Sequence, residues 1–225
     1  MRLSILIFDG FTTLDAIGGY EVLSRLPGME VEFVAEQRGV VAADTRALGL
    51  LAFRSFDEVT ETDILYVPGG PGGVPMETDK RFLDKIRQLD ATSTWTLGVC
   101  NGTATLAAAG VLVGKTAACN WFYQHRLADY GVTFTPARYH RDGKYVTSAG
   151  VSASIDAALF LASLIGGEFI AKAIQLGIEY YPAPPFPEKG PLEVAKEIYD
   201  LVSQFEAGGG AELLKLKPVF DQGAQ

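Results

Sequence analysis

The chain has 225 residues, of which 48% are hydrophobic and 20% are charged, so we expect one globular domain with a proper core rather than a disordered chain or a disulfide scaffold. The 19 basic and 27 acidic side chains give a formal net charge of −8, and without a lysine or arginine block this balance predicts no nucleic-acid partner. The two cysteines are too few for a disulfide framework, and no run approaches 18 apolar residues, which predicts a soluble, cytoplasmic protein with no membrane partner.

Short apolar runs and helical periodicity alternate along the chain. The opening run has no small-residue cleavage site, so we interpret it as a buried strand rather than a signal peptide. A helix is expected from Thr13, a plausible N-cap, and Asp142-Gly143 predicts a hairpin over residues 139–148. The other predicted strands and helices are, in order, strands 2–8, 31–35, 50–54, 64–67, 94–99 and 116–119 and helices 80–89, 102–112, 121–130, 152–165, 168–176 and 191–205.

This alternation predicts an α/β fold, a three-layer αβα sandwich with a mainly parallel central sheet. We expect residues 1–206 to form a single domain. The glycine run at 208–210 predicts a glycine-rich C-terminal tail over residues 207–225, free or in contact with a partner. In such sheets ligands bind beyond the carboxyl ends of strands, which here follow Phe8, Val67 and Val99.

The segment after the last of these strands contains Cys100 between Gly98 and Gly102. A residue flanked by glycines at positions −2 and +2, where a strand turns into a helix, has the form of a nucleophile elbow with cysteine in the place of serine. A helix N-terminus favours the thiolate, so we interpret Cys100 as a nucleophile rather than a buried structural cysteine. Cys119 has no such setting and is expected in the core.

Two further features adjoin this strand edge. The amides of the loop 69–73 are candidates to hold an anion or an oxyanion beside Cys100, although the loop also reads as a simple tight turn. Asp15 lies among apolar neighbours in the first turn of a helix. Its carboxyl is either a helix-capping group or a general acid/base toward Cys100, and the residues alone leave both open.

Histidine is scarce, with only His125 and His140. A three-histidine zinc site is impossible, and no ligand spacing for a metal is present, so we expect no metal. A Cys–His pair would need His125 beside Cys100, and we favour a surface helix for His125 instead.

Together these residues resemble the ThiJ/PfpI superfamily, and within it the isonitrile (isocyanide) hydratases. The resemblance rests on Phe8-Asp9-Gly10 with Leu14-Asp15, on Val67-Pro68-Gly69-Gly70, on the elbow at Cys100, and on the segment QLGIEYYPAPPF at 175–186. It covers about residues 2 to 190. It implies a class I glutamine amidotransferase-like (flavodoxin-like) fold and a homodimer.

The resemblance also implies the chemistry. Cys100 would be the nucleophile and Asp15 the proton-transfer group in a lyase reaction that adds water to R–N≡C, without a cofactor, to give an N-substituted formamide. The substrate-binding and oxyanion groups would be Gly70, Pro71, Asn101 and Gly102. The chain departs from the hydratases at Asn101, where threonine is expected, and at Asn120, where histidine is expected before tryptophan.

Other readings stay open at this point. One is another enzyme of the superfamily, a glyoxalase, deglycase or amidase that acts on small carbonyl compounds. Glutamate in the place of Asp15 and a histidine near the cysteine would be expected for a glyoxalase. A second is a non-catalytic ligand-binding module, as in AraC-like regulators, although no helix-turn-helix region follows. A third is a redox sensor whose cysteine is oxidised.

Overall fold

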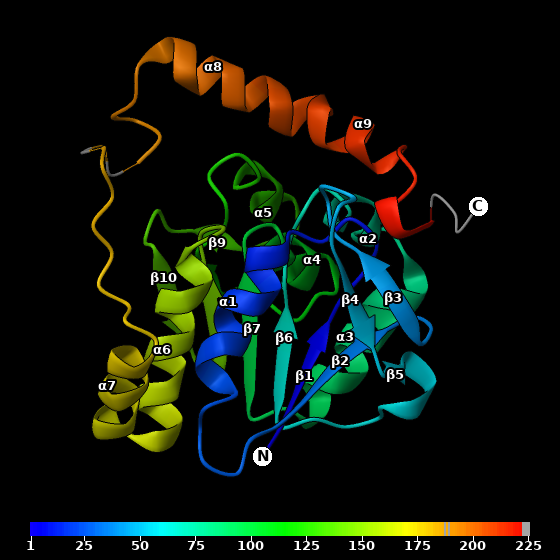
Figure 1. Ribbon diagram of the computed structural model, residues 1–225, viewed down its shortest axis with the longest axis vertical. Coiled ribbons are helices and arrows are strands. Elements are labelled where there is room, and N and C mark those ends of the chain that lie inside the picture. Colours follow the sequence, from blue (N-terminus) through cyan, green and yellow to red (C-terminus); the bar gives the residue numbers. More distant parts are fainter. Residues whose placement is uncertain (187, 189, 222–225) are drawn as a thin grey trace.

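We describe the fold from a computed structural model that covers residues 1–186, 188 and 190–221. In this part of the chain seven strands form a central sheet in the order β10-β11-β7-β6-β1-β2-β5 (Figure 1). Only β10 runs antiparallel to its neighbour, which confirms the mainly parallel sheet. The strands are β1 (Arg2–Leu6), β2 (Glu30–Ala35), β5 (Arg54–Ser55), β6 (Ile64–Val67), β7 (Trp95–Val99), β10 (Tyr139–Asp142) and β11 (Tyr145–Ser148).

Helices cover both faces of this sheet (Figure 1). On one face α1 (Thr13–Leu23) packs against α6 (Ala153–Gly166), which packs against α7 (Glu168–Gly177). On the other face α3 (Lys80–Thr92) packs against α2 (Gly73–Met76) and α4 (Gly102–Ala108). Every residue of β6 is buried, as a strand covered on both faces requires. The predicted three-layer αβα sandwich is therefore confirmed.

The register of the central strands brings their carboxyl ends together. Ile5 of β1 pairs with Tyr66 of β6, and Tyr66 pairs with Leu97 of β7. The loops that follow these three strands consequently meet at one edge of the sheet, where ligands bind in open α/β folds.

Some short elements differ from the sequence prediction. The expected strand 50–54 forms β4 (Gly49–Ala52), which pairs with β3 (Gly39–Ala42) in an antiparallel hairpin outside the central sheet. Two short strands, β8 (Thr116–Ala117) and β9 (Thr133–Phe134), pair with each other. The expected helix 121–130 is reduced to α5 (His125–Asp129). The Asn120 side chain accepts a hydrogen bond from the Phe122 N–H at 2.9 Å, and such a turn competes with helix formation.

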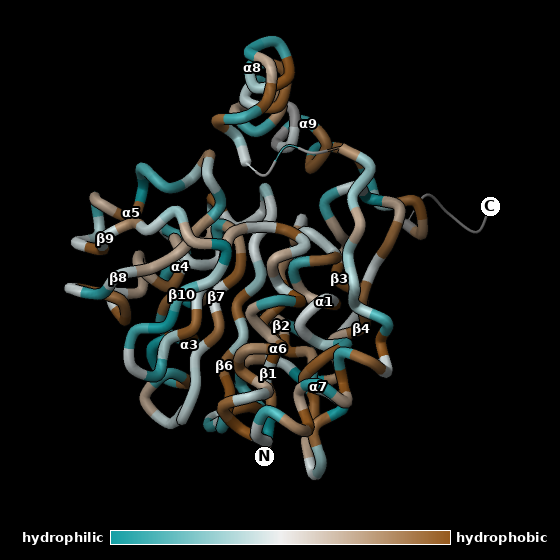
Figure 2. Tube along the Cα trace, turned by 90° about the vertical axis from the view of Figure 1, so that its left-hand side faces the viewer, coloured by the Kyte–Doolittle hydropathy of each residue, from teal (hydrophilic) through white to brown (hydrophobic). Residues whose placement is uncertain are grey.

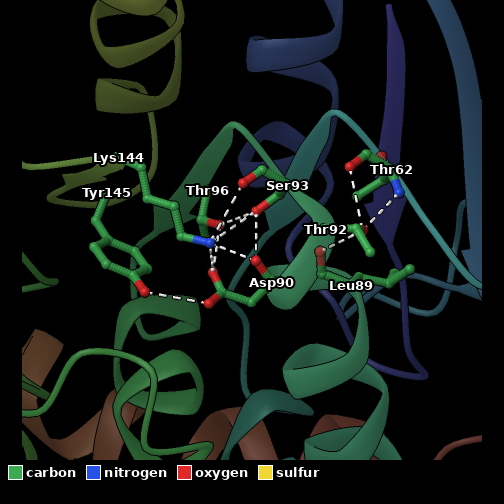
Figure 3. Close-up of polar contacts among 8 residues, drawn as sticks. All are labelled: Thr62, Leu89, Asp90, Thr92, Ser93, Thr96, Lys144 and Tyr145. Carbon is green, nitrogen blue, oxygen red and sulfur yellow. Dashed lines mark hydrogen bonds and ion pairs between the residues drawn. The ribbon is translucent and has the colours of Figure 1, made fainter.

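The predicted hairpin of β10 and β11 is confirmed, and a buried polar cluster fixes its turn (Figure 3). The Lys144 ammonium lies 3.1 Å from the Asp90 carboxylate and donates to the Ser93 hydroxyl at 3.2 Å. Asp90 also accepts hydrogen bonds from the hydroxyls of Thr96, at 2.7 Å, and Tyr145, at 3.2 Å. These bonds join the hairpin to the end of α3 at the amino end of β7.

Near the C-terminus, a segment of the chain crosses the sheet at the carboxyl ends of its parallel strands (Figures 1 and 2). We call residues 196–221 the C-terminal strap. It contains α8 (Lys196–Gln204), a π-helical segment (Phe205–Gly209), α9 (Gly210–Leu214) and a final 3-10 turn (Val219–Asp221).

The sequence predicts a tail from the glycine run onward, but in the structure helical residues continue through this run to Leu214. Glycine lowers helix stability by about 1 kcal/mol, but contacts of the strap with the domain override this weak preference. The division at residue 206 stays a prediction. None of the helices in the described residues is long and apolar enough to cross a membrane.

Candidate active site

Cys100 occupies a strained turn between β7 and α4. Its φ of 59° lies in the left-handed region, which residues other than glycine seldom adopt. A side chain at Gly98 would lie 2.6 Å from the Leu106 side chain, and one at Gly102 would lie 2.5 Å from the Pro68 carbonyl oxygen. Both glycines thus allow close packing around the turn, and at Gly102 the neighbouring atoms belong to the backbone.

Asp15 points its carboxyl across the sheet edge toward this turn. The residue is fully buried in the first turn of α1. Its Oδ2 accepts a hydrogen bond from the Gly69 N–H at 3.2 Å, and the carboxyl also interacts with the Cys100 thiol. Oδ1 has no hydrogen-bond partner among the described residues. The Asp15 carboxyl thus accepts a hydrogen bond from the loop after β6 rather than capping its own helix. Oδ1 is therefore available for proton transfer.

The surroundings of this pair disfavour the charged form of both groups. Burial raises the pKa of Asp15 well above its usual range, although the bonds from Cys100 and Gly69 lower it in part. Burial, then the nearby Asp15 carboxyl, raise the pKa of Cys100 well above its usual range. Desolvation and the neighbouring acid therefore oppose the preference of the helix N-terminus for the thiolate.

Asn101 holds the glycine loop against the elbow. Its Oδ1 accepts a hydrogen bond from the Gly70 N–H at 2.7 Å, and its Nδ2 donates to the Gly70 carbonyl at 2.8 Å. The amides of Gly69 and Gly70 thus already have acceptors in this structure. The backbone N–H of Asn101 bonds to the Cys100 sulfur, where it lowers the thiol pKa in part.

The structure brings together the residues singled out from the sequence. Gly70 and Asn101 are hydrogen-bonded to each other, and Gly102 packs against the backbone carbonyls of Val67 and Pro68. Pro71 contacts the strap at Gly210. The roles of these four residues in substrate binding stay predictions.

Cys119 and His125 lie where the sequence suggests. Cys119 is buried, and its thiol donates to the Cys100 carbonyl at 3.2 Å, so it supports the elbow from the core. His125 is exposed at the start of α5, with Nδ1 3.0 Å from the Phe122 carbonyl oxygen. In the described part of the chain no cluster of His, Cys, Asp and Glu is placed to hold a metal ion.

Sequence reasoning missed two neighbours of the thiol. Gly150 precedes α6 and approaches so closely that a side chain there would lie 2.7 Å from the Cys100 sulfur. Glu206, in the strap, adds a small charge effect to that of burial, which raises the pKa values of Asp15 and Cys100. Gly150 follows a predicted strand end, which is a usable signal, whereas nothing local in the sequence places Glu206 near Cys100.

Comparisons with known proteins agree with this arrangement. The DJ-1/PfpI family model matches residues 1–164. An isonitrile hydratase from Pseudomonas putida is 36% identical over 200 residues, which cover 89% of this chain and 87% of the relative. A deglycase from Pyrococcus abyssi is 26% identical over 66% of this chain and 89% of its own length.

Among solved structures, a ThiJ/PfpI family protein from Pseudomonas syringae superimposes with a TM-score of 0.88 at 27% identity, covering 96% of this chain and 90% of that one. By sequence and by fold, this chain is a member of the DJ-1/PfpI family.

Proposed function

We propose that this protein is a cysteine-dependent isonitrile hydratase, a hydro-lyase that converts R–N≡C and water into the formamide R–NH–CHO. The observation that carries the proposal is the buried pair of Cys100 and Asp15, in which a carboxyl whose pKa is raised by burial interacts directly with the thiol. The relative with isonitrile hydratase activity in its name supports the same reaction class.

The first step joins the thiol to the isocyanide carbon. The Cys100 sulfur attacks this carbon and forms the C–S bond, while Asp15 delivers a proton to the same carbon and takes up the thiol proton. The product is a thioimidate, R–N=CH–S–Cys. The free Oδ1 of Asp15 is the oxygen suited to deliver this proton.

The second step releases the formamide. Water adds to the thioimidate carbon, its oxygen becomes the carbonyl oxygen, and the C–S bond breaks. One water proton goes to the substrate nitrogen and the other returns to Cys100, with Asp15 as the relay. Because every proton comes from water or from these two residues, the reaction needs no cofactor.

The groups around the pair would position the substrate. Asn101 fixes the loop at Gly70 and Pro71, and its own N–H reaches the reacting sulfur. Gly102 lets the elbow approach the carboxyl end of β6. We propose these four residues as the binding side of the site.

The test is ultraviolet absorbance of the protein with p-nitrophenyl isocyanide. Formamide should appear with the intact chain and with Cys119→Ala, which keeps the nucleophile, but not with Cys100→Ala or Cys100→Ser. Turnover retained in Cys100→Ala would end the proposal. If the intact chain turns over methylglyoxal instead, the reaction belongs to the carbonyl-acting branch that includes deglycases.

We also propose a homodimer in the cytoplasm that acts on a small molecule. Exposed apolar side chains of α7, Phe169 at 82% and Leu176 at 64%, are suited to contact between copies. Two free, buried thiols fit a reducing compartment. Light scattering after size exclusion should give twice the chain mass, and a monomer would contradict the assembly.

A further inference from the structure

The C-terminal strap contacts the domain at several points around the active site. At one end the Tyr199 ring lies 4.9 Å from the Trp121 ring. Further along, Gly210 packs on Pro71. A Cβ atom placed on Gly210 would lie 3.1 Å from the Pro71 Cβ. Leu214 covers Gly10, and the Leu216 carbonyl accepts from the Arg46 Nε at 3.0 Å. The strap therefore crosses the carboxyl edge of the sheet, over the loops that follow β1 and β6 (Figures 1 and 2).

Glu206 lies between these attachment points. It belongs to the π-helical segment between α8 and α9, and such segments are frequent at functional sites. Its carboxylate accepts a hydrogen bond from the Tyr123 hydroxyl, and Tyr123 is itself buried close to Cys100. The Tyr123 contact holds the Glu206 carboxylate at the inner side of the strap.

A second acidic residue lies near Glu206, and the nearby arginines pair with other carboxylates. Asp44 accepts a hydrogen bond from the Thr12 hydroxyl at 2.7 Å. Burial raises the pKa values of Asp15 and Glu206, and the charge of Asp44 adds to this effect at both groups. The nearby arginines are already paired. Arg46 lies 2.8 Å from Asp9, and Arg126 lies 2.9 Å from the buried Glu77.

We propose that Glu206 is a specificity-determining residue whose carboxylate, carried over Cys100 by the strap, rejects anionic substrates and admits neutral or cationic ones. An anionic group on the substrate would be repelled by Glu206 and Asp44, because Arg46 and Arg126 are already paired with other carboxylates. A neutral or cationic group would meet no such repulsion. This inference rests on the proposed function, because it names the substrate class of the same site.

A pair of alkylating probes tests the charge of the site without any turnover. Iodoacetamide and iodoacetate differ in charge but attach by the same displacement, in which the Cys100 sulfur bonds to the methylene carbon and iodide leaves. The ratio of their rates at pH 8, read by peptide mass spectrometry at Cys100, cancels the fraction of thiolate. Glu206→Gln is the isosteric variant, and Glu212→Gln is the control that removes an exposed charge elsewhere on the strap.

In Glu206→Gln the rate with iodoacetate should rise about tenfold relative to iodoacetamide, as expected for the loss of a like charge near the reacting carbon. The ratio for Glu212→Gln should stay within about twofold of the intact protein, because an exposed charge is screened by salt. An unchanged ratio in Glu206→Gln would overturn the proposal. An equal rise for both probes would also overturn it, since this would show only a looser strap.

A second comparison uses substrates. Methyl isocyanoacetate and isocyanoacetate differ by the same single charge, and Glu206→Gln should reduce the preference for the ester by about tenfold in kcat/KM. If neither compound is turned over while the alkylation ratio changes, the proposed reaction fails and this inference stands. If both are turned over with an unchanged preference, the reaction stands and this inference fails.

Discussion

The Asn101 carboxamide is hydrogen-bonded at both ends to one residue, Gly70, with 2.7 Å from the Gly70 N–H to Oδ1 and 2.8 Å from Nδ2 to the Gly70 carbonyl. Asn101 is fully buried, so neither bond competes with water. This residue follows the nucleophile, and its side chain ties the elbow to the loop that also donates to Asp15. The pair therefore couples the two chemical groups of the site through the backbone.

Asn101→Ala should lower both stability and activity. The substitution leaves the buried Gly70 N–H without a partner, whereas the Gly70 carbonyl keeps its hydrogen bond from the Gly73 N–H at 2.9 Å. The unpaired N–H should cost about 1–3 kcal/mol in the free energy of unfolding. The loosened loop also releases Asp15, so kcat should fall more than KM rises. Urea unfolding and steady-state kinetics with the isocyanide check this, and a variant with native stability would contradict the structural role.

The two glycines of the elbow should differ in tolerance. At Gly98 a methyl group meets the end of the Leu106 side chain, which can move, and the cost should be about 1 kcal/mol. At Gly102 it meets the backbone carbonyls of Val67 and Pro68, which cannot move, and the cost should be about 3 kcal/mol or more. Thermal unfolding of Gly98→Ala and Gly102→Ala gives the order, and the reverse order would contradict this packing.

Asp15 should reduce stability at neutral pH. Its pKa is raised in the folded protein, so the folded state keeps a proton that the unfolded chain loses above a pH of about 4. Stability is therefore lost as the pH rises from the unfolded pKa toward the folded pKa, by about 1.4 kcal/mol for each pKa unit between the two.

Asp15→Asn removes this loss. The variant should be more stable than the intact protein near neutral pH, yet have little activity, and the difference should shrink toward pH 4. Urea unfolding at several pH values measures it. A variant that is less stable at every pH would favour a purely structural role for Asp15.

The cluster at Lys144 should matter for stability alone. Lys144→Met leaves the partly buried Asp90 carboxylate without its ammonium partner, which should cost about 2–3 kcal/mol. Because this cluster lies at the amino end of β7, kcat/KM of the folded variant should be unchanged. A double-mutant cycle with Asp90→Asn should give a coupling of about 1 kcal/mol or more, and additive effects would contradict the interaction.

The sequence was most informative where short-range patterns determine structure. The apolar run of β6 predicted its bounds, and the glycines around Cys100 predicted a sharp strand-to-helix turn. The hairpin at Asp142-Gly143 was equally local. These features depend on neighbouring residues, so one chain suffices to predict them.

The features that sequence reasoning missed depend on distant contacts. Glu206 reaches the site because Tyr199 and Leu214 attach the strap to the domain on either side of it. The glycine run instead predicts a tail from residue 207 onward. The side chain of Asn101 bonds to a loop 31 residues away, which no spacing rule predicts. The raised pKa of Cys100 follows from burial and from the nearby Asp15. Its position at a helix N-terminus, which the sequence shows, predicts neither effect.

The most direct test of the central claim is to trap the covalent intermediate. The protein is mixed with p-nitrophenyl isocyanide, quenched in acid on the millisecond scale, and analysed by intact-protein and peptide mass spectrometry. The account predicts the mass of one isocyanide added at Cys100 before formamide reaches its steady rate, with no adduct at Cys119. Formamide production without any adduct at Cys100 would contradict it.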